Sequence, residues 1–227
     1  MDRQLYKLDW NDTEVRLAKG RFRHTLRRPD AELILQRERE IPNEIPLRKD
    51  GSYSIPDPTV TEETDAKYYD QLVSETAGYD GRDVPTQHKA AAFQGLYVRE
   101  IFVDEDEDLF ADQVTVTEQI GPDDDPQFVI RHVLAVDERQ LQKARRKFAA
   151  GHLEHDKRGR QKYVAEQNLS AAMEFYRSWL VRIDGATVNG ETFSPATRDA
   201  FFETVDPLIQ RKVVKTLVDE VCGRLLD

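Results

Sequence analysis

Hydrophobic and polar residues alternate in two stretches of the chain, one near the start of each half. In the first stretch the alternating positions form three short runs: Tyr6, Leu8 and Trp10; Val15 and Leu17; and Phe22, His24 and Leu26. Alternation with a period of two is typical of a half-buried strand. The sequence therefore predicts a three-stranded meander at the N-terminus.

The second stretch has the same character. Val114 and Val116 alternate before a turn-rich segment at 121–126, and the alternation resumes after it at Phe128, Ile130, His132 and Leu134. Glycine, proline and aspartate favour turns for separate steric and hydrogen-bonding reasons. At least one β-hairpin is expected here.

Helical spacing follows each stretch. Pro29 and Asp137 suit the first turn and the N-cap of a helix, respectively. Further apolar positions at helical spacing, and helix-start signals, predict helices in five segments: 61–76, 85–103, a helix of about twenty residues that includes 172–183, one that starts at Ser194-Pro195, and one from Asp206-Pro207 to the chain end.

Two segments interrupt this plan. Residues 41–59 contain four prolines and a glycine, which predict an extended, exposed arm. Residues 184–193 contain Asp184-Gly185 and Asn189-Gly190, two strong turn signals that predict an extra hairpin in the second half.

The two halves also resemble each other in sequence. An offset of 108 residues places Phe22-Arg23-His24 over Ile130-Arg131-His132, as well as Leu33 over Leu141 and Arg37 over Arg145. An offset of 107 then pairs Tyr69 with Tyr176 and Gly78 with Gly185, and a third block pairs Pro85 with Pro207. Blocks that recur in the same order indicate a duplicated unit.

The expected fold is therefore a helix-rich α+β protein of two related halves, each a small antiparallel sheet followed by helices. The predicted organisation is a first repeat at 1–103, an acidic linker at 104–111 and a second repeat at 112–227. His24 and His132 fall on equivalent inward strand positions. We predict that both are buried imidazoles hydrogen-bonded to the backbone, with a structural role.

Composition narrows the class of protein. The chain has 227 residues, 33 Lys and Arg against 43 Asp and Glu, and a formal net charge of −10. No apolar run reaches the length of a membrane span, and the start of the chain lacks the pattern of a signal peptide. These features favour a cytoplasmic protein, and the acidic balance disfavours non-specific nucleic-acid binding.

The sequence contains no phosphate loop, nucleophile elbow, paired cysteines or zinc-protease helix. His152 and His155 with their acidic neighbours form the nearest approach to a metal site, but their surroundings favour a polar loop. The acidic runs 104–108 and 123–125 lack a calcium-loop pattern, and Cys222 fits a small core residue. We therefore name no catalytic, cofactor-binding or metal-ligating residue and expect no cofactor.

The candidate contact residues are basic and lie in one segment of the second half: Arg145, Arg146, Lys157, Arg158, Arg160 and Lys162. In an acidic chain this patch favours contact with an acidic surface of another subunit over contact with phosphate. We give a third interpretation, a solvated basic face that contacts no partner, the same weight as the protein and phosphate contacts together.

The strand-to-helix passages Phe22–Arg37 and Ile130–Arg145, together with the C-terminal helices, resemble the plan of bacteriophage tail-assembly chaperones and small head or tail structural proteins. The resemblance implies a non-catalytic protein that binds other assembly or virion proteins, and it identifies no functional residue. Two alternatives remain: a metal-dependent enzyme with an unfamiliar site, and a nucleic-acid-associated adaptor that uses 145–162.

Overall fold

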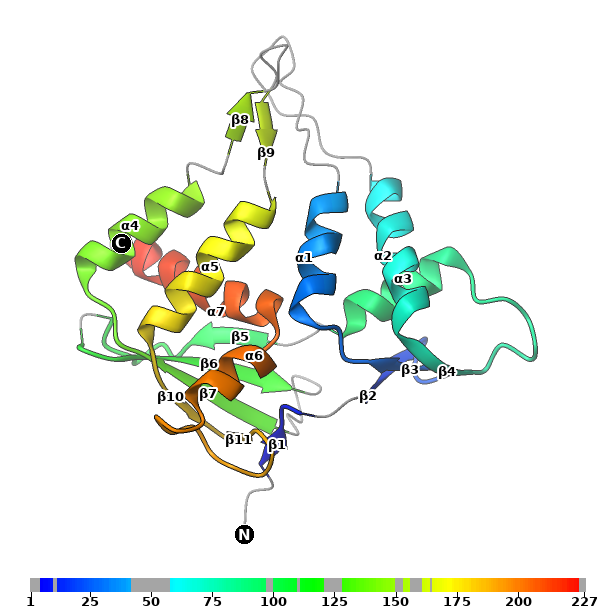
Figure 1. Ribbon diagram of the computed structural model, residues 1–227, viewed down its shortest axis with the longest axis horizontal. Coiled ribbons are helices and arrows are strands. Elements are labelled where there is room, and N and C mark those ends of the chain that lie inside the picture. Colours follow the sequence, from blue (N-terminus) through cyan, green and yellow to red (C-terminus); the bar gives the residue numbers. More distant parts are fainter. Residues whose placement is uncertain are drawn as a thin grey trace. The chain divides into compact units, whose positions relative to one another are not determined.

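The computed structural model describes residues 5–9, 12–41, 58–96, 100–109, 111–120, 128–149, 153–155, 161–163 and 165–224 (Figure 1). The chain divides into two compact units. The N-terminal unit comprises Trp10–Val98 and Gly151–Gln167, and the C-terminal unit comprises Met1–Asp9, Arg99–Ala150 and Asn168–Asp227. Each unit combines an antiparallel sheet with helices, so the predicted helix-rich α+β class is confirmed.

The N-terminal unit has a three-stranded antiparallel sheet in the order β2-β3-β4. Its strands are β2 (Asp12–Leu17), β3 (Phe22–Arg27) and β4 (Val73–Ala77). Its helices are α1 (Ala31–Glu40), α2 (Pro58–Leu72) and α3 (Thr86–Gly95). Helices α2 and α3 pack against each other, and they also contact β3 and β2, respectively. The short antiparallel pair β8 (Leu153–His155) and β9 (Gln161–Tyr163) is grouped with this unit.

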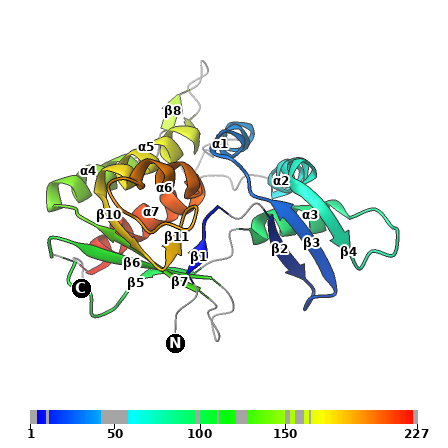
Figure 2. The same ribbon diagram turned by 60° about the horizontal axis from the view of Figure 1, so that its bottom comes forward.

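The C-terminal unit has a four-stranded antiparallel sheet in the order β10-β7-β6-β5. Its strands are β5 (Glu100–Val103), β6 (Val114–Ile120), β7 (Phe128–Leu134) and β10 (Leu180–Asp184). Its helices are α4 (Glu138–Ala149), α5 (Ala165–Trp179), α6 (Arg198–Thr204) and α7 (Pro207–Arg224). Helices α4, α5 and α6 lie on one side of this sheet (Figure 2). A separate parallel pair joins β1 (Tyr6–Lys7) to β11 (Ala186–Thr187).

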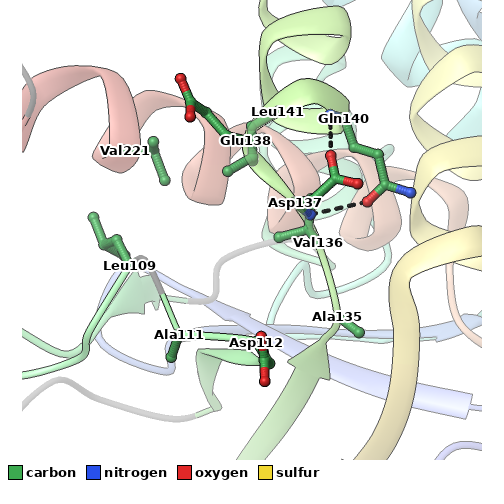
Figure 3. Close-up of a pocket in the computed structure, with 10 residues that line it drawn as sticks. All are labelled: Leu109, Ala111, Asp112, Ala135, Val136, Asp137, Glu138, Gln140, Leu141 and Val221. Atoms are coloured by element: carbon green, nitrogen blue, oxygen red, sulfur yellow. Dashed lines mark hydrogen bonds between the residues drawn. The ribbon is translucent and has the colours of Figure 1, made fainter.

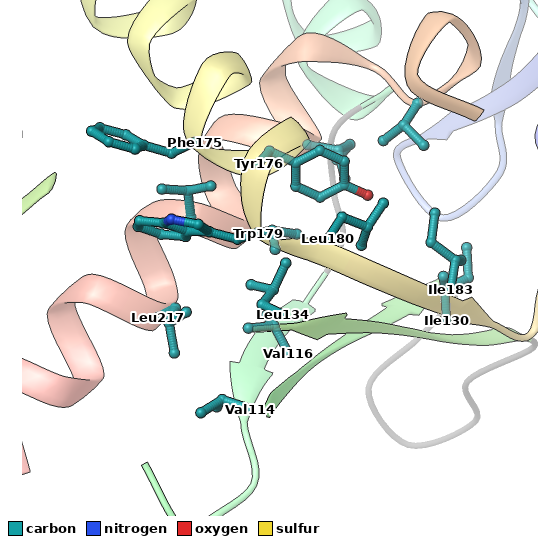
Figure 4. Packing of buried hydrophobic residues seen from close by; sticks show 14 of the residues in the cluster. Val114, Val116, Ile130, Leu134, Phe175, Tyr176, Trp179, Leu180, Ile183 and Leu217 are labelled. Atoms are coloured by element: carbon teal, nitrogen blue, oxygen red, sulfur yellow. The ribbon is translucent and has the colours of Figure 1, made fainter. Parts of the chain in front are cut away.

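Large apolar side chains from the sheet and from α5 and α7 fill the core of the C-terminal unit (Figure 4). Trp179 is 1% exposed, and its ring stacks on Phe175 at a centroid distance of 5.1 Å. Leu134 and Leu217 are completely buried. Burial of apolar surface on this scale is the main favourable contribution to folding.

The two units share one order of elements. In each, a β-hairpin is followed by two helices and then by a strand that pairs with the second hairpin strand. Helix α3 follows this strand in the N-terminal unit, and β11, α6 and α7 follow it in the C-terminal unit. The N-caps correspond as well: Asp30 accepts a hydrogen bond from the backbone N–H of Leu33, and Asp137 accepts one from that of Gln140, each at 2.7 Å. Both caps satisfy backbone donors that the first turn of a helix leaves unpaired.

The cap positions correct the sequence alignment by one residue within the first helices. When Asp30 is matched with Asp137, buried Ile34 falls on buried Leu141, and Arg37 falls on Ala144 rather than on Arg145. Arg37 is 9% exposed whereas Arg145 is exposed to solvent, so the two arginines are not equivalent. Arg37 and Arg145 appeared to match in the sequence because their aligned helix positions differ by only one residue.

Gly78 and Gly185 occupy equivalent turns and have equivalent constraints. Their φ angles are 94° and 85°, and a Cβ atom at either position would lie about 2 Å from a backbone oxygen, that of Arg21 or Val129. Only glycine combines a positive φ with so close an approach. Each glycine directly follows a strand, β4 or β10, so each turn ends the strand that pairs with the second hairpin strand.

Several predicted boundaries are wrong. Residues 73–76 and 180–183 are strands, not the ends of helices, and 100–103 is strand β5. Strand β1 pairs with β11 rather than with β2, so the third strand of the N-terminal sheet is β4. The segment beginning at Ser194 starts with a turn, and α6 begins at Arg198.

The acidic segment 104–111 is not a linker between the units. Strand β5 precedes it and pairs antiparallel with β6, which follows it, so its described residues belong to a connection within one sheet. In the second half, Val188 and Glu191 exchange two backbone hydrogen bonds of 2.9 Å around Asn189-Gly190, which places a tight turn within the predicted 184–193 hairpin. The arm at 41–59 lies outside the described residues except for its ends.

Candidate functional site

The inward-facing histidine of each central strand is hydrogen-bonded to a tyrosine. Nδ1 of His24 on β3 lies 2.8 Å from the hydroxyl of Tyr69 on α2, and Nδ1 of His132 on β7 lies 2.8 Å from that of Tyr176 on α5. All four residues are at most 1% exposed. The expectation of buried imidazoles was therefore right, but their partners are tyrosine hydroxyls, not the backbone groups we predicted.

In the C-terminal unit a carboxylate completes the network. Nε2 of His132 lies 2.9 Å from Oε2 of Glu118 on β6, and the Glu118 residue is 1% exposed. Burial, with a smaller contribution from Glu118, raises the pKa of Tyr176 well above its usual value. Tyr176 therefore stays protonated and can donate to His132. The Glu118–His132–Tyr176 chain resembles a catalytic relay in composition, but it is closed to solvent.

In the N-terminal unit a second tyrosine takes the place of the carboxylate. The hydroxyl of Tyr79 lies 2.9 Å from Nε2 of His24 and 2.8 Å from Nδ1 of His88. Tyr79 and His88 are half-buried, and Phe22 stacks on the Tyr79 ring at 4.7 Å. This network therefore runs from the core towards the surface.

The protonation of this network is constrained. Burial, followed by repulsion from His88, lowers the pKa of His24 below the usual 6.5. When both imidazoles are neutral, all three hydrogen bonds can form in one direction: Tyr69 donates to His24, His24 donates to Tyr79, and Tyr79 donates to His88. If both imidazoles were charged, two N–H groups would point at the single Tyr79 oxygen. The cluster therefore accepts one proton more easily than two.

A buried ionic cluster links the three helices of the N-terminal unit. Arg37 on α1 donates to Oδ1 of Asp65 on α2 at 2.8 Å and to Glu38 at 2.6 Å. Gln94 on α3 donates to Oδ2 of Asp65 at 2.9 Å. The Arg37 guanidinium also lies over the Phe93 ring, 5.3 Å from its centroid. The contacts with Asp65, Gln94 and Phe93 join α1, α2 and α3, so we assign this cluster a structural role.

The C-terminal unit has a pocket of about 750 Å³ beside the start of α4 (Figure 3). Three parts of the chain and α7 form its walls, which consist of Leu109, 111–112, 135–138, 140–141 and Val221. Leu109, Leu141 and Val221 are 6–7% exposed and make an apolar floor. The carboxylates of Asp112 and Glu138 are at the rim, and both residues are exposed.

Not all carboxylates at the pocket are available to a ligand. Asp137 caps α4, and its own backbone N–H donates to Oε1 of Gln140 at 3.0 Å, so the two residues form a reciprocal capping pair. Oε1 of Glu138 accepts a hydrogen bond from Gln142 at 2.9 Å, and the Glu138 residue is exposed. The pocket thus combines an apolar floor with negative charge from Asp112 and Glu138 at its rim.

The structure places the predicted contact residues unevenly. Arg145 and Arg146 are exposed on α4, the helix whose first turn lines the pocket. Lys157, Arg158 and Arg160 lie outside the described residues, as do His152 and the acidic run 123–125. For Lys162 in β9, His155 in β8 and Cys222 in α7, the backbone is described but the side chain is not.

The acidic run at 104–108 forms a turn in which the backbone N–H of Glu107 donates to the carbonyl of Asp104 at 3.0 Å. Oε1 of Glu107 accepts from the backbone N–H of Thr115 at 2.8 Å, so this side chain supports the start of β6. Among the described residues, no three histidine, cysteine, aspartate or glutamate side chains are grouped as metal ligands. Within the same residues, no helix has the length and apolarity needed to cross a bilayer.

Sequence reasoning missed Glu118, Tyr79, His88 and the pocket. Glu118 had a usable signal, because a glutamate at an inward position of a predicted strand needs a buried partner. The pocket had none, since its walls come from segments far apart in the chain. Comparison with protein-family models, curated proteins and solved structures found no match to the chain.

Proposed function

We propose that this chain is a non-catalytic assembly protein that acts through protein–protein contacts, and that its pocket receives a basic side chain of a partner protein. The resemblance in plan to phage tail-assembly chaperones and head or tail proteins supports a virion component or tail-assembly factor. Neither role requires a cofactor.

The observation that carries the proposal is the composition of the pocket. Arginine and lysine side chains have a long apolar stem and a charged end, so they fit a site with apolar walls and a negative rim. Leu141 and Val221 would contact the stem, while Glu138 and Asp112 would face the charged group. An arginine can form two parallel hydrogen bonds with a carboxylate, which adds specificity.

The closed histidine network is consistent with a non-catalytic role. A catalytic group must reach the reacting atoms, whereas His132, Glu118 and Tyr176 are each at most 1% exposed. Their hydrogen bonds join β6, β7 and α5, which is a structural task. The network therefore supports the scaffold on which the pocket is built.

The proposal can be tested with short fluorescein-labelled peptides in which leucines flank a central arginine, lysine, glutamine or glutamate. Fluorescence anisotropy should show binding of the arginine and lysine peptides only, and binding should weaken as salt rises. Glu138→Gln and Asp112→Asn should each reduce the affinity several-fold. Glu203→Gln, at an exposed position on α6, is the matched control.

Equal binding of all four peptides, or affinity that Glu138→Gln leaves unchanged, would count against the pocket as a contact site. A DNA duplex is the second probe in the same assay. Binding of DNA that weakens steeply with salt and depends on Arg145 and Arg146 would favour the nucleic-acid adaptor instead.

A further inference from the structure

One outer face of α4 carries a negative charge in the first turn and a positive charge about two turns later. Glu138, Gln142 and Arg145 are spaced four and three residues apart, so they lie in one row along the helix, and all three are exposed. Gln142 donates to Glu138 at 2.9 Å. Arg145 forms no ion pair with any residue that the structure describes.

We propose that α4 pairs antiparallel with α4 of a second copy of this chain, about a two-fold axis close to Gln142. Reversal of the row about its centre brings Glu138 of each copy opposite Arg145 of the other. The inference rests on the proposed function, because it names a second copy as the partner that supplies the basic side chain.

The spacing along the helix fits this arrangement. With a rise of about 1.5 Å per residue, Glu138 and Arg145 lie about 6 Å and about 4.5 Å along the axis from Gln142. The two distances are similar, so both ionic contacts can form at once in a symmetric pair. Such a contact is isologous and closes as a dimer.

The pocket adds an apolar component to the pairing. Glu138 belongs both to the charged row and to the pocket rim, and Leu141 and Val221 form the floor next to it. The Arg145 stem of the second copy would cover this floor while its guanidinium meets Glu138 and Asp112. The contact therefore does not depend on exposed charges alone, which contribute little by themselves.

The helix dipole offers a simpler reason for acidic residues at the start of α4 and basic residues at its end. That effect acts within a single chain and is independent of protein concentration. It also does not explain Arg139, a basic residue in the first turn. The two explanations differ in the mass they predict in solution.

The test is analytical ultracentrifugation of the full chain at rising protein concentration, at low and at high salt. We expect a monomer–dimer equilibrium that shifts towards monomer at high salt. Glu138→Arg and Arg145→Glu should each weaken the dimer at least about tenfold. The double variant Glu138→Arg/Arg145→Glu should dimerise more tightly than either single variant, because the charges at 138 and 145 are exchanged but remain complementary. Its affinity should stay below that of the parent chain, because Asp112 remains acidic.

Arg139→Glu is the matched control, since it makes the same charge change on the same helix about 100° away from Glu138. It should leave the dimer affinity nearly unchanged. Circular dichroism and thermal unfolding of each variant would show that the fold is retained.

A chain that stays monomeric at every concentration and salt overturns the pairing. A dimer whose affinity neither reversal changes also overturns it, and so does a double variant that dimerises no more tightly than the single variants. The peptide assay separates this failure from failure of the proposed function. A monomer that still binds arginine peptides through Glu138 retains the contact site and loses only the second copy as its partner.

Discussion

Nδ1 of His132 lies 2.8 Å from the hydroxyl of Tyr176, and both side chains are buried. The same pair recurs in the N-terminal unit as His24 and Tyr69, again at 2.8 Å. In both units the histidine lies on an inner strand of the main sheet, and the tyrosine lies on the helix that precedes the last strand of that sheet. Each pair therefore fixes a helix on its sheet through a hydrogen bond within the core.

Removal of the Tyr176 hydroxyl should destabilise the C-terminal unit. Tyr176→Phe keeps the ring but leaves Nδ1 of His132 unpaired in the core, which costs about 1–3 kcal/mol of unfolding free energy. Urea unfolding measures the change. A double-mutant cycle with Glu118→Gln should show non-additive losses, because both residues hydrogen-bond to His132. Additive losses would indicate two independent contacts.

The close turn at Gly185 should tolerate no side chain. Gly185→Ala adds a Cβ atom at a φ of 85°, within 2.1 Å of the Val129 carbonyl oxygen, so it should cost more than the roughly 1 kcal/mol of an unfavourable backbone angle. Gly190→Ala is the matched control, because Gly190 has a φ of 80° with no atom within 4 Å of the added Cβ. Equal changes in thermal midpoint would contradict a role for the close approach.

The N-terminal unit should lose stability as the pH falls. The folded-state pKa of His24 is below 6.5, so the unfolded chain binds more protons on acidification. The stabilisation is fully present above about pH 6.5 and is lost as the pH falls towards the folded-state pKa. Urea unfolding between neutral and mildly acidic pH, compared with His24→Phe, isolates this contribution.

Histidine NMR titration can separate the two causes of the lowered His24 pKa. His88→Gln removes the repulsion between the imidazoles, so the pKa of His24 should rise. It should stay below 6.5, because burial is the larger cause. A value unchanged from that of the parent protein would show that His88 does not affect the His24 charge.

The buried ionic cluster should matter far more than an exposed pair. Arg37→Ala removes the cation that pairs with the Asp65 carboxylate in the core, a loss of about 3–5 kcal/mol. Arg16→Ala removes an ion pair with Glu14 whose side chains are 68% and 40% exposed, and it should cost at most about 1 kcal/mol. Chemical unfolding of both variants tests the difference, and similar losses would contradict it.

The fold class and most helix starts follow from the sequence, because N-caps and apolar spacing are local signals. The strand after α5 was misread for a specific reason. A register shift between Leu180 and Arg182 lets Leu180 and Ile183, three residues apart, both be buried on a strand. This spacing continues the helical period of Tyr176 and Trp179, so periodicity alone cannot locate the boundary. A register shift occurs at the corresponding β3–β4 pair as well.

The candidate site was harder to predict from the sequence than the fold. Basic residues of α4 were identified, since charge is visible in a sequence. Their acidic counterpart at Asp112 and Glu138 was not, because the fold alone brings these residues together around Leu141. Pairs such as His24 and Tyr69 could be aligned between the halves, yet their hydrogen bond depends on how each helix crosses its sheet.

The pairing of β1 with β11 affects the order in which the protein can fold. Tyr6 lies opposite Ala186, and the Asn189 N–H donates to Asp9 at 3.1 Å, so the first described strand meets its partner only after most of the chain has been made. In the sequence, residues 10–98 of the N-terminal unit thus lie between strands β1 and β5 of the C-terminal unit. On a ribosome the Trp10–Val98 part of this unit can fold early, while residues 5–9 wait for a contact of very long sequence separation. Contacts of this kind slow folding, so the C-terminal unit should be completed last.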